Sequence, residues 1–560
     1  MKQLIECVPN FSEGRDPAVL KLITDEIEKV NGVKLLDVDA GYATNRTVVT
    51  FVGEPEPVIE AAFRAIKMAA DVIDMSKHSG EHPRMGATDV CPLIPIANIS
   101  MEECAAWAHK LAKRVGEQTD VPVYMYEAAA TRSERQNLAT IRAGEYEALP
   151  RKMAMPEWAP DYGKAHFNAR AGATVIGARD FLVAYNVNLN TTSVRRANSV
   201  AFDVREQGRI LREGDPINGP IVNDENGEPV RIPGTCKSVK GIGWFIEEYG
   251  IAQVSMNLTN INISPLHIVF EECCKSADRH GLRVTGSELV GLVPKKVLTD
   301  AGMYFLEKQR RSAGVSEEEL IDIAVKTMGL GELSPFDPKK KIIEYQMEDS
   351  SASPLVEMNL RKFASVTASE SPAPGGGSVS AYVGTLGISL ATMVANLSSH
   401  KKGWESQWES FSAVAVRGQQ LKDELLRMVD EDTSAFNGIM EAFAMPKNTA
   451  EEKSARTAQI QAATKIAIEI PLKVMELCFA TFDIIEDMVK RGNPNSVTDA
   501  GVGALCARAA VHGAYLNVKI NSSGLKDATF VETTLKRAKE IITQTDLREK
   551  QILQMVNERM

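Results

Sequence analysis

The stretch FLVAYNVNLN, residues 181–190, indicates the fold class of the middle of the chain. Its apolar residues alternate with Ala184 and three asparagines; they are Val183, Tyr185, Val187 and Leu189. Period-two alternation predicts a β-strand with one apolar face and one hydrogen-bonding face. The stretch VSMNLTN, residues 254–260, repeats the pattern. We therefore expect a sheet whose polar face is either exposed to solvent or forms the floor of a binding cleft.

The segments before this sheet also alternate between strands and helices. Strands rich in β-branched residues are predicted at 3–8, 33–38, 47–53 and 121–127. A helix that opens at Pro55 and Pro57 has apolar residues at helical spacing, namely Ile59, Phe63, Ile66, Ala70 and Ile73. Residues 208–237 contain many turn-forming residues and are predicted to be an exposed excursion. These patterns predict an α/β fold of two sandwich subdomains with ferredoxin-like character.

The pattern changes after MEDSSASP, residues 347–354, which is the best linker candidate in the chain. Long amphipathic patterns follow at 404–443, 449–490 and 525–558, and strand signals vanish. An all-α helical bundle is therefore expected in the last third. We predict subdomains at 1–180 and 181–346, a linker at 347–354 and a helical domain at 355–560.

Composition and charge narrow the class of protein. The 560-residue chain is 44% hydrophobic with a net charge of -10, which is typical of a soluble enzyme and argues against a general nucleic-acid or membrane-surface binder. The eight cysteines form no CxxC pair, and the N-terminus lacks the apolar core of a signal peptide, so we expect a cytoplasmic protein with reduced thiols. The uncharged stretch 376–399 is rich in Gly, Ser, Thr and Asn, which favours a helix buried among other helices over a membrane span.

Two histidines lie four residues apart in KHSGEHPRMGATDV, residues 77–90. A zinc pair of His78 and His82 would need a continuous helix, which Gly80 and Pro83 disfavour. A metal site would then require other ligands that converge in space. The alternatives are a surface histidine in a turn and an imidazole that a rigid loop presents to a cleft as a general acid or base.

Charged residues near this loop extend the acid–base hypothesis. Arg84 could hold the carboxylate of a substrate, and Glu81 or Asp89 could orient a ring nitrogen. Asp39 comes at the end of a predicted strand, where α/β sheets commonly carry active sites. Asp39 could therefore act as a partner of His82.

An aspartate interrupts the apolar stripe of the long helix predicted at 404–443. The stripe consists of Leu421, Leu425, Val429, Phe436, Ile439 and Phe443. The spacing places Asp432 on the buried face, whereas Asp430 should point elsewhere. Because burial tends to raise the pKa of a carboxyl group, Asp432 is a candidate proton donor or acceptor. A buried ion pair or a helix-to-helix hydrogen bond would explain the position equally well.

A glycine-rich loop, SPAPGGGSVSA (371–381), precedes the uncharged helix. Its central residues are Gly375, Gly376, Gly377 and Ser378. The free N–H groups at such a helix start suit an anion. The loop has neither the GxGxxG nor the Walker pattern, and a plain helix start is the alternative.

The chain resembles the formiminotransferase–cyclodeaminase family. ECVPNFSEGRD, LLDVDAG, TNRTVVTFVG, GEHPRMGATDVCPLIPI, IRAGEYEALPRK and GATVIGARDFLVAYNVN are similar to the formiminotransferase domain, and ASESPAPGGGSVSA, MPKNTAEEK and HGAYLNVKIN to the cyclodeaminase domain. The resemblance implies transfer of the formimino group from N-formimidoyl-L-glutamate to N5 of tetrahydrofolate in histidine breakdown. Cyclisation to 5,10-methenyltetrahydrofolate with release of ammonia then follows.

The resemblance also implies roles for particular residues. It places the transferase histidine on His82 and the cyclodeaminase aspartate on Asp432, and we add Asp39 as a third catalytic candidate. The implied folate-binding segment is Gly163, Lys164, Ala165, His166, Phe167, Asn168, Ala169, Arg170, Ala171 and Gly172. Further substrate contacts are predicted at Arg84, Gly375, Gly376, Gly377 and Ser378. The two cations of the folate segment could meet the carboxylates of the glutamyl tail.

The implied chemistry suits these groups. One imidazole could take the proton of N5 and return one to the departing glutamate nitrogen. A carboxylate in a low-dielectric pocket could relay the proton of cyclisation and stabilise amidinium-like charge. Neither step needs a metal or a redox cofactor, and tetrahydrofolate is the one-carbon acceptor. Polyglutamylated intermediates and homo-oligomers occur in the family and are expected here.

Three alternatives differ in class. Only the transferase step could be active, which would leave the helical domain as a folate-binding or oligomerisation module. A metal-dependent hydrolase could release formamide from formiminoglutamate, and a folate carrier would bind without turnover. Dependence on tetrahydrofolate would exclude the hydrolase, whereas loss of turnover on chelation would favour it.

Overall fold

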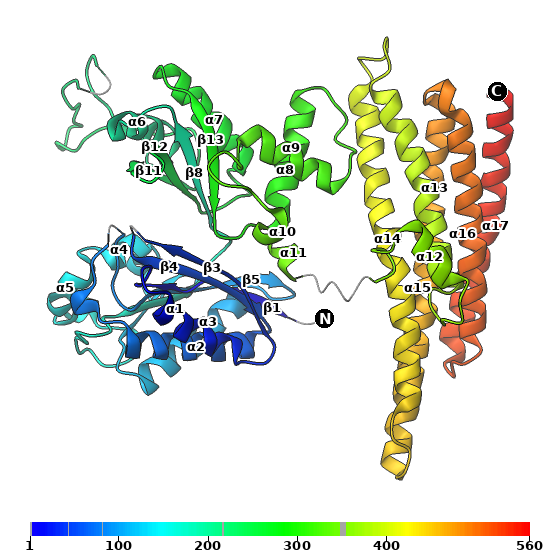
Figure 1. Ribbon diagram of the computed structural model, residues 1–560, viewed down its shortest axis with the longest axis horizontal. Helices are drawn as coiled ribbons and strands as arrows, with labels where there is room; N and C mark the ends of the chain where they lie inside the picture. Colours follow the sequence, from blue (N-terminus) through cyan, green and yellow to red (C-terminus); the bar gives the residue numbers. More distant parts are fainter. Residues whose placement is uncertain (1–2, 43, 81, 216–217, 348–353) are drawn as a thin grey trace. The chain divides into compact units, whose positions relative to one another are not determined.

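The computed structural model describes residues 3–42, 44–80, 82–215, 218–347 and 354–560. The chain divides into two compact units (Figure 1). Residues 1–298 and 325–347 form an α/β unit, and residues 299–324 and 348–560 form a helical unit. The predicted order of an α/β region followed by a helical region is confirmed. The predicted linker lies almost entirely outside the described residues.

The first sheet of the α/β unit places the starts of two strands at one edge. Its strand order is β1-β4-β2-β5-β7-β6, with β3 paired to β4. The strands are β1 Leu4–Cys7, β2 Asn10–Phe11, β3 Val33–Gly41, β4 Arg46–Gly53, β5 Thr88–Ala97, β6 Val123–Glu127 and β7 Thr174–Ala178. Because β4 and β5 both run antiparallel to β1 and β2, their N-terminal ends share an edge.

Helices cover one face of this sheet and bury its apolar side. They are α1 (Pro17–Glu28), α2 (Pro55–Val72) and α3 (Met101–Gln118) (Figure 1). Phe63 and Ile66 of α2 are buried as predicted, in one core with Ile5 and Phe51 of the sheet. Two short helices, α4 (Leu138–Arg142) and α5 (Glu145–Met153), follow β6 and precede the predicted folate segment.

The second sheet confirms the alternation at 181–190. Its order is β11-β12-β8-β13, all antiparallel. The elements are β8 Val183–Leu189, β11 Val239–Ile246, β12 Ile251–Leu258 and β13 Val284–Val290, with helices α6 Val194–Val204 and α7 Leu266–Arg279. Asn186 and Asn188 on the polar face are buried as well, and Gln253 Nε2 donates to Asn188 Oδ1 at 2.8 Å. The polar face is therefore buried at Asn186, Asn188 and Gln253, whereas Asn257 toward its other end is exposed.

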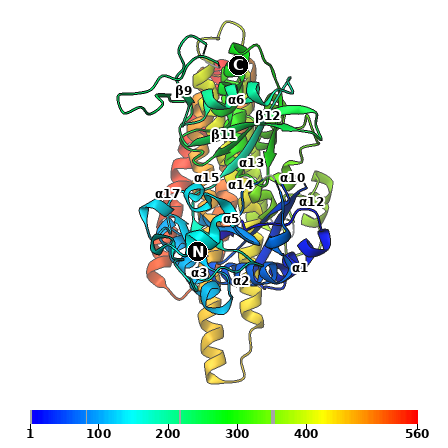
Figure 2. The same ribbon diagram turned by 90° about the vertical axis from the view of Figure 1, so that its left-hand side faces the viewer.

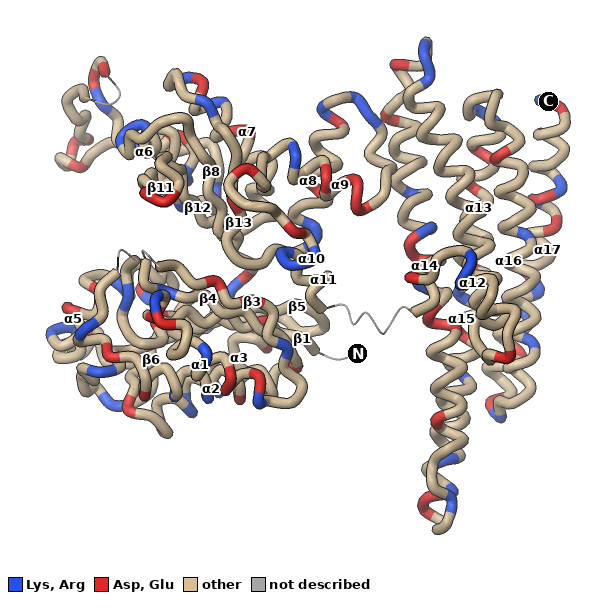
Figure 3. Tube along the Cα trace, viewed as in Figure 1, with Lys and Arg blue, Asp and Glu red and all other residues tan. Residues whose placement is uncertain are grey.

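The predicted excursion at 208–237 contains a small hairpin. β9 (Arg209–Ile210) pairs antiparallel with β10 (Arg231–Ile232). Acidic and basic residues are intermixed along both units (Figure 3), as expected for a chain of modest net charge.

The helical unit is built around five long helices. They are α13 Gly376–Ser399, α14 Trp408–Ala444, α15 Ala450–Arg491, α16 Val497–Ser522 and α17 Ala528–Arg559. Shorter helices lie between the second sheet and α13 along the chain, namely α8 Lys295–Lys308, α9 Glu317–Met328, α10 Pro338–Lys341, α11 Ile343–Met347 and α12 Leu360–Thr367. The helices α14, α15 and α17 correspond to the predicted amphipathic patterns. In contrast, α16 has no such pattern because it packs through small residues, among them Ala500, Ala504, Ala507 and Ala510.

The uncharged helix α13 lies in the core of the helical unit. By length and composition it could cross a membrane, but 61% of its most apolar window is buried within the protein. That burial agrees with the predicted helix among other helices.

The predicted apolar stripe of α14 is correct only in part. Leu425 and Val429 are buried, but Phe436 is 40% and Phe443 is 50% exposed, so the prediction of burial beyond Asp432 is wrong. The reason is that the end of α14 and the start of α15 extend beyond the other long helices (Figures 1 and 2).

Candidate active sites

His82 lies in the loop between a short 3-10 helix, η1 (Met75–Lys77), and β5. Its Nδ1 is 2.7 Å from the carbonyl oxygen of Pro83. Because a carbonyl only accepts, Nδ1 carries the proton, which leaves the Nε2 lone pair to accept one. Burial, followed by the charges of Arg46 and Arg142, lowers the pKa of His82 to about 4. The imidazole is therefore neutral at pH 7.

A buried charge cluster lies close to His82. Arg46 Nη1 is 2.5 Å from Asp89 Oδ2, and Arg142 Nη2 donates to the same oxygen. Asp89 Oδ1 also accepts from the backbone N–H of Met85 at 2.9 Å. Asp89 thus holds the two arginines and the loop, while the ring of His82 is oriented by a backbone carbonyl. Glu81, the other orienting group suggested by the sequence, lies outside the described residues.

His78 and Arg84 are already engaged with other groups. Arg84 donates to His78 Nδ1 at 3.3 Å, and its guanidinium pairs with Glu145 at 3.0 Å and with Glu147 at 2.7 Å. His78 Nε2 is 2.9 Å from the carbonyl oxygen of Asn45. Both nitrogens of His78 therefore have partners, which does not favour a zinc pair with His82. Arg84 was predicted to hold a carboxylate of the substrate, but its guanidinium is already paired with Glu145 and Glu147.

Asp39 lies on β3 opposite Val48 of β4. Within the part of the chain that the structure describes, no hydrogen bond or ion pair joins Asp39 to His82. Its catalytic role therefore stays a prediction.

The predicted folate segment packs against the histidine loop through its backbone. The backbone N–H groups of Met75 and Ala87 each donate at 2.8 Å, to the carbonyls of Arg170 and Ala171 respectively. Gly172 has φ +68°, and a Cβ there would lie 2.2 Å from the Met85 carbonyl oxygen, so only glycine allows this approach. The structure thus brings together two segments that are far apart in the sequence.

The outer part of the folate segment remains open. Gly163, Lys164, Ala165, His166, Ala169 and Arg170 are exposed. Asn168 stabilises the turn, because its Oδ1 accepts from the N–H groups of Arg170 and Ala171. Tyr146 Oη donates to the Ala169 carbonyl at 2.5 Å, and its ring packs against Phe167. The loop is therefore rigid at its base and accessible along its outer side.

A second site lies at the N-terminus of α13. Asp432 of α14 accepts a hydrogen bond from Ser378 Oγ to its Oδ2 at 3.1 Å. Burial raises the pKa of Asp432, and hydrogen bonds from the side chain and backbone of Ser378 partly oppose the rise. A Cβ on Gly377 would lie 2.1 Å from Asp432 Oδ1. The glycine loop therefore accommodates this carboxylate, which itself occupies the helix start predicted to suit an anion.

Asp430 serves a different purpose from Asp432. It is 5% exposed, and its carboxylate accepts from the N–H groups of Leu355 at 2.9 Å and Val356 at 3.3 Å. Its partners differ from those of Asp432, but the prediction that Asp430 lies off the buried face is wrong, because it is buried while Asp432 is half-buried. Asp430 thereby fixes the residues that precede α12.

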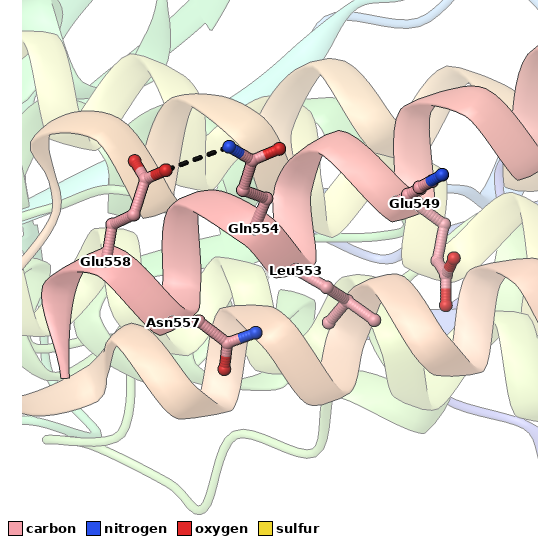
Figure 4. Close-up of a pocket in the computed structure, with 6 residues that line it drawn as sticks. Glu549, Leu553, Gln554, Asn557 and Glu558 are labelled. Atoms are coloured by element: carbon pink, nitrogen blue, oxygen red, sulfur yellow. Dashed lines mark hydrogen bonds between the residues drawn. The ribbon is translucent and has the colours of Figure 1, made fainter.

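A shallow hollow on α17 does not form part of either site (Figure 4). Its lining residues are Glu549, Lys550, Leu553, Gln554, Asn557 and Glu558. All come from one helix, and Gln554 Nε2 already donates to Glu558 Oε1 at 2.9 Å, so the hollow cannot enclose a ligand.

Comparison with known proteins assigns a family to both regions. The formiminotransferase domain, N-terminal subdomain, matches residues 4–179, and the formiminotransferase domain matches residues 184–348. The formiminotransferase-cyclodeaminase family matches residues 359–540. The histidine site lies in the first of these ranges and the aspartate site in the last.

Two relatives agree with this division, and one solved structure is similar to part of the chain. A formimidoyltransferase-cyclodeaminase of Gallus gallus is 44% identical over 535 residues, which cover 95% of each chain. A glutamate formimidoyltransferase of Streptococcus pyogenes serotype M1 is 41% identical over 307 residues, 55% of this chain and 94% of that protein. The crystal structure of a formiminotetrahydrofolate cyclodeaminase from Thermotoga maritima covers 36% of this chain and 97% of its own, with 26% identity and a TM-score of 0.33.

The chain is thus of the class that joins a formiminotransferase region to a helical cyclodeaminase region. It belongs to the formiminotransferase–cyclodeaminase family.

Proposed function

We propose that the chain moves the formimino group of N-formimidoyl-L-glutamate to N5 of tetrahydrofolate and then cyclises the product to 5,10-methenyltetrahydrofolate, releasing ammonia. One observation carries the proposal: the family match extends over both regions, and each region holds one desolvated proton-transfer group, His82 and Asp432. The chain is thus a transferase and a lyase in one.

In the transfer step, His82 acts as the proton shuttle. N5 attacks the formimino carbon, and Nε2 of the neutral imidazole takes the N5 proton. The imidazolium then gives that proton to the glutamate nitrogen as the carbon–nitrogen bond breaks. The hydrogen bond from Nδ1 to the Pro83 carbonyl keeps Nε2 directed to the reacting atoms throughout.

Tetrahydrofolate binds along the segment 163–172, whose exposed side lies next to the loop that carries His82. Lys164 and Arg170 are exposed there and meet the carboxylates of the glutamyl tail, including those of polyglutamylated folate. Asp39 acts from the edge of the same sheet. Neither step uses a metal or redox cofactor.

In the cyclisation step, Asp432 is the proton donor. N10 attacks the formimino carbon and its proton passes to the formimino nitrogen, which takes a second proton from Asp432 and leaves as ammonia. The methenyl bridge keeps the positive charge and Asp432 is left as a carboxylate. The raised pKa of this carboxyl group favours the protonated form that the step needs. The loop Gly375–Ser378 forms the rest of the folate contact.

The pH dependence of transfer follows from the environment of His82. We expect the acid limb of kcat/KM for formiminoglutamate to lie near pH 4, well below 6.5. The reason is that kcat/KM reports the ionisation of the free enzyme, in which the pKa of His82 is about 4. Activity should fall only as pH drops through that value. Rates of glutamate release across the range check this, with Asp432→Asn as a control for the second site. An acid limb near pH 6.5 would contradict the placement of His82.

Substitution of Gly377 tests the approach of Asp432 to the helix start. In Gly377→Ala, the new Cβ would meet Asp432 Oδ1, so the carboxylate must move. We expect cyclodeamination to fall by about 10²-fold, since small misplacements of a reacting group cost that much. Glutamate release should stay unchanged. Ser380→Ala in the same helix is the matched control, and equal losses in both variants would contradict the account.

Several wider assignments belong to the same proposal. Residues 1–180 and 181–346 form the transferase, residues 347–354 the linker and residues 355–560 the cyclodeaminase. The family matches at 4–179, 184–348 and 359–540 support this division. The β-α-β-β-α-β order around the second sheet, leaving out the β9–β10 hairpin, supports ferredoxin-like character. The enzyme is cytoplasmic and forms homo-oligomers.

Glutamate release separates this proposal from a hydrolase. Purified protein is mixed with formiminoglutamate with and without tetrahydrofolate, and with and without a chelator. Release that requires tetrahydrofolate and survives chelation supports the transferase. Release without tetrahydrofolate that is lost on chelation would identify a metal-dependent hydrolase instead.

A further inference from the structure

The cluster beside His82 contains more positive than negative charge. Arg46 is 9% exposed, Arg142 is 15% exposed and Asp89 is fully buried. Among the residues that the structure describes, Asp89 is the one carboxylate that either guanidinium pairs with. The other acceptor of Arg46 is the neutral Asn10 Oδ1, at 3.1 Å from its Nε. Two permanent cations therefore share one anion.

Arg142 also has an unused donor. Its Nε is buried, and no described residue accepts a hydrogen bond from it. A buried N–H without a partner is unfavourable, and more so on a charged group. Arg84, in the loop that carries His82, differs, since its guanidinium pairs with Glu145 and Glu147. The guanidinium of Arg142 is 15% exposed, so a bound anion could reach it there and offset the spare charge.

This cluster lies within electrostatic range of the proton-transfer nitrogen. Arg46 and Arg142 both oppose protonation of His82, and Asp89 favours it. Among the described residues, those three groups and the Pro83 carbonyl act on the ring in addition to its burial. An anion that joined the cluster would therefore change the basicity of His82.

We propose that Arg142, together with Arg46, forms the subsite for a carboxylate of the formimino donor, and that this carboxylate completes the charge balance beside His82. The inference rests on the proposed function and deepens it by naming the group that recognises the donor. Arg142 is a binding residue, and by holding the donor carboxylate it also places a negative charge near His82. Without donor, His82 is a weak base; with the donor carboxylate bound, its pKa rises and it can take the N5 proton.

Binding of L-glutamate, the product that retains both carboxylates, tests the subsite. Calorimetry on the full chain compares wild type, Arg142→Gln and the exposed control Arg151→Gln. We expect the Kd for glutamate to rise about 10- to 100-fold in Arg142→Gln, as for a lost charge-assisted hydrogen bond. The Kd for tetrahydrofolate and both Kd values of Arg151→Gln should stay within about twofold. An unchanged glutamate Kd in Arg142→Gln overturns the proposal.

Thermal stability separates a binding role from a structural one. In Arg142→Gln, Asp89 keeps its pair with Arg46, so one cation then faces one anion. We expect Tm to stay the same or rise. A fall in Tm together with equal losses of glutamate and tetrahydrofolate binding would show a structural role and overturn the proposal.

The titration of His82 gives a readout that does not depend on any variant. Histidine ring NMR of the wild type should show the pKa of His82 rise by about one unit on saturation with glutamate, since a bound carboxylate offsets the nearby cations. Arg142→Gln should lose most of that rise. No rise in the wild type overturns the proposal even if Arg142→Gln does not fold.

The two proposals can fail separately. If the wild type transfers no formimino group but glutamate binds through Arg142, the proposed function fails and the carboxylate subsite stands. If transfer is normal and Arg142→Gln binds glutamate as tightly as the wild type, only the subsite fails.

Discussion

His82→Ala is expected to reduce formimino transfer by about 10²- to 10⁴-fold, the usual contribution of a positioned general acid–base group. The structure gives the reason: Nδ1 is held by the Pro83 carbonyl, so Nε2 is the one nitrogen directed to a proton. Cyclodeamination should be unaffected, because Asp432 serves that step in the helical unit. The measurement is glutamate release from formiminoglutamate, with ammonia release from added 5-formiminotetrahydrofolate in parallel.

His78→Gln is the matched control for this variant. His78 lies four residues earlier, but its nitrogens bond to Arg84 and to the Asn45 carbonyl. Loss of the His78 imidazole should lower Tm, whereas the rate of transfer should fall far less than in His82→Ala. If His78→Gln lost transfer as completely as His82→Ala, the assignment of the proton shuttle to His82 would be wrong.

Asp432→Asn is expected to stop the second step and leave the first intact. The amide keeps the shape of the side chain and can still accept from Ser378 Oγ, but it has no acidic proton to give. We expect formation of methenyltetrahydrofolate to fall by at least about 10²-fold. Glutamate should still appear, and 5-formiminotetrahydrofolate should accumulate. Absorbance of the methenyl product and the ammonia yield measure the block.

Asp430→Asn provides the comparison two residues away. Its carboxylate holds the N–H groups of Leu355 and Val356, so the variant should lose about 1–3 kcal/mol of stability. Its turnover below Tm should stay near that of the wild type. A complete loss of cyclodeamination in Asp430→Asn, with activity retained in Asp432→Asn, would reverse the assignment.

Strand alternation in the sequence predicted β8 correctly but not what covers it. The burial of every second side chain follows from period two, as Tyr185 and Val187 show. Asn188 is equally buried while Asn257 on the same face is exposed, and no pattern within the strands encodes that difference. The stripe of α14 failed beyond Asp432 for a related reason, since the helix extends past its neighbours there.

The candidate sites were predictable where a single residue carries the signal. His82 was indicated by its rigid loop, and Asp432 by its place in an apolar stripe. The cluster beneath His82 was not predicted as a unit, because Arg46 and Arg142 lie 43 and 53 residues from Asp89 in the sequence. The signal available was a charged residue near the start of each of two strands, Arg46 in β4 and Asp89 in β5. The N-terminal ends of these two strands lie at the same end of the sheet.

The stoichiometry of a single coupled reaction tests the central claim most directly. Wild-type protein is given formiminoglutamate and tetrahydrofolate, and glutamate, methenyltetrahydrofolate and ammonia are measured together. Two sites on one chain predict equal yields of all three products, and recovery of all three when His82→Ala and Asp432→Asn proteins are mixed. Glutamate without the other two products, in the wild type, would contradict the assignment of cyclodeamination to the helical unit.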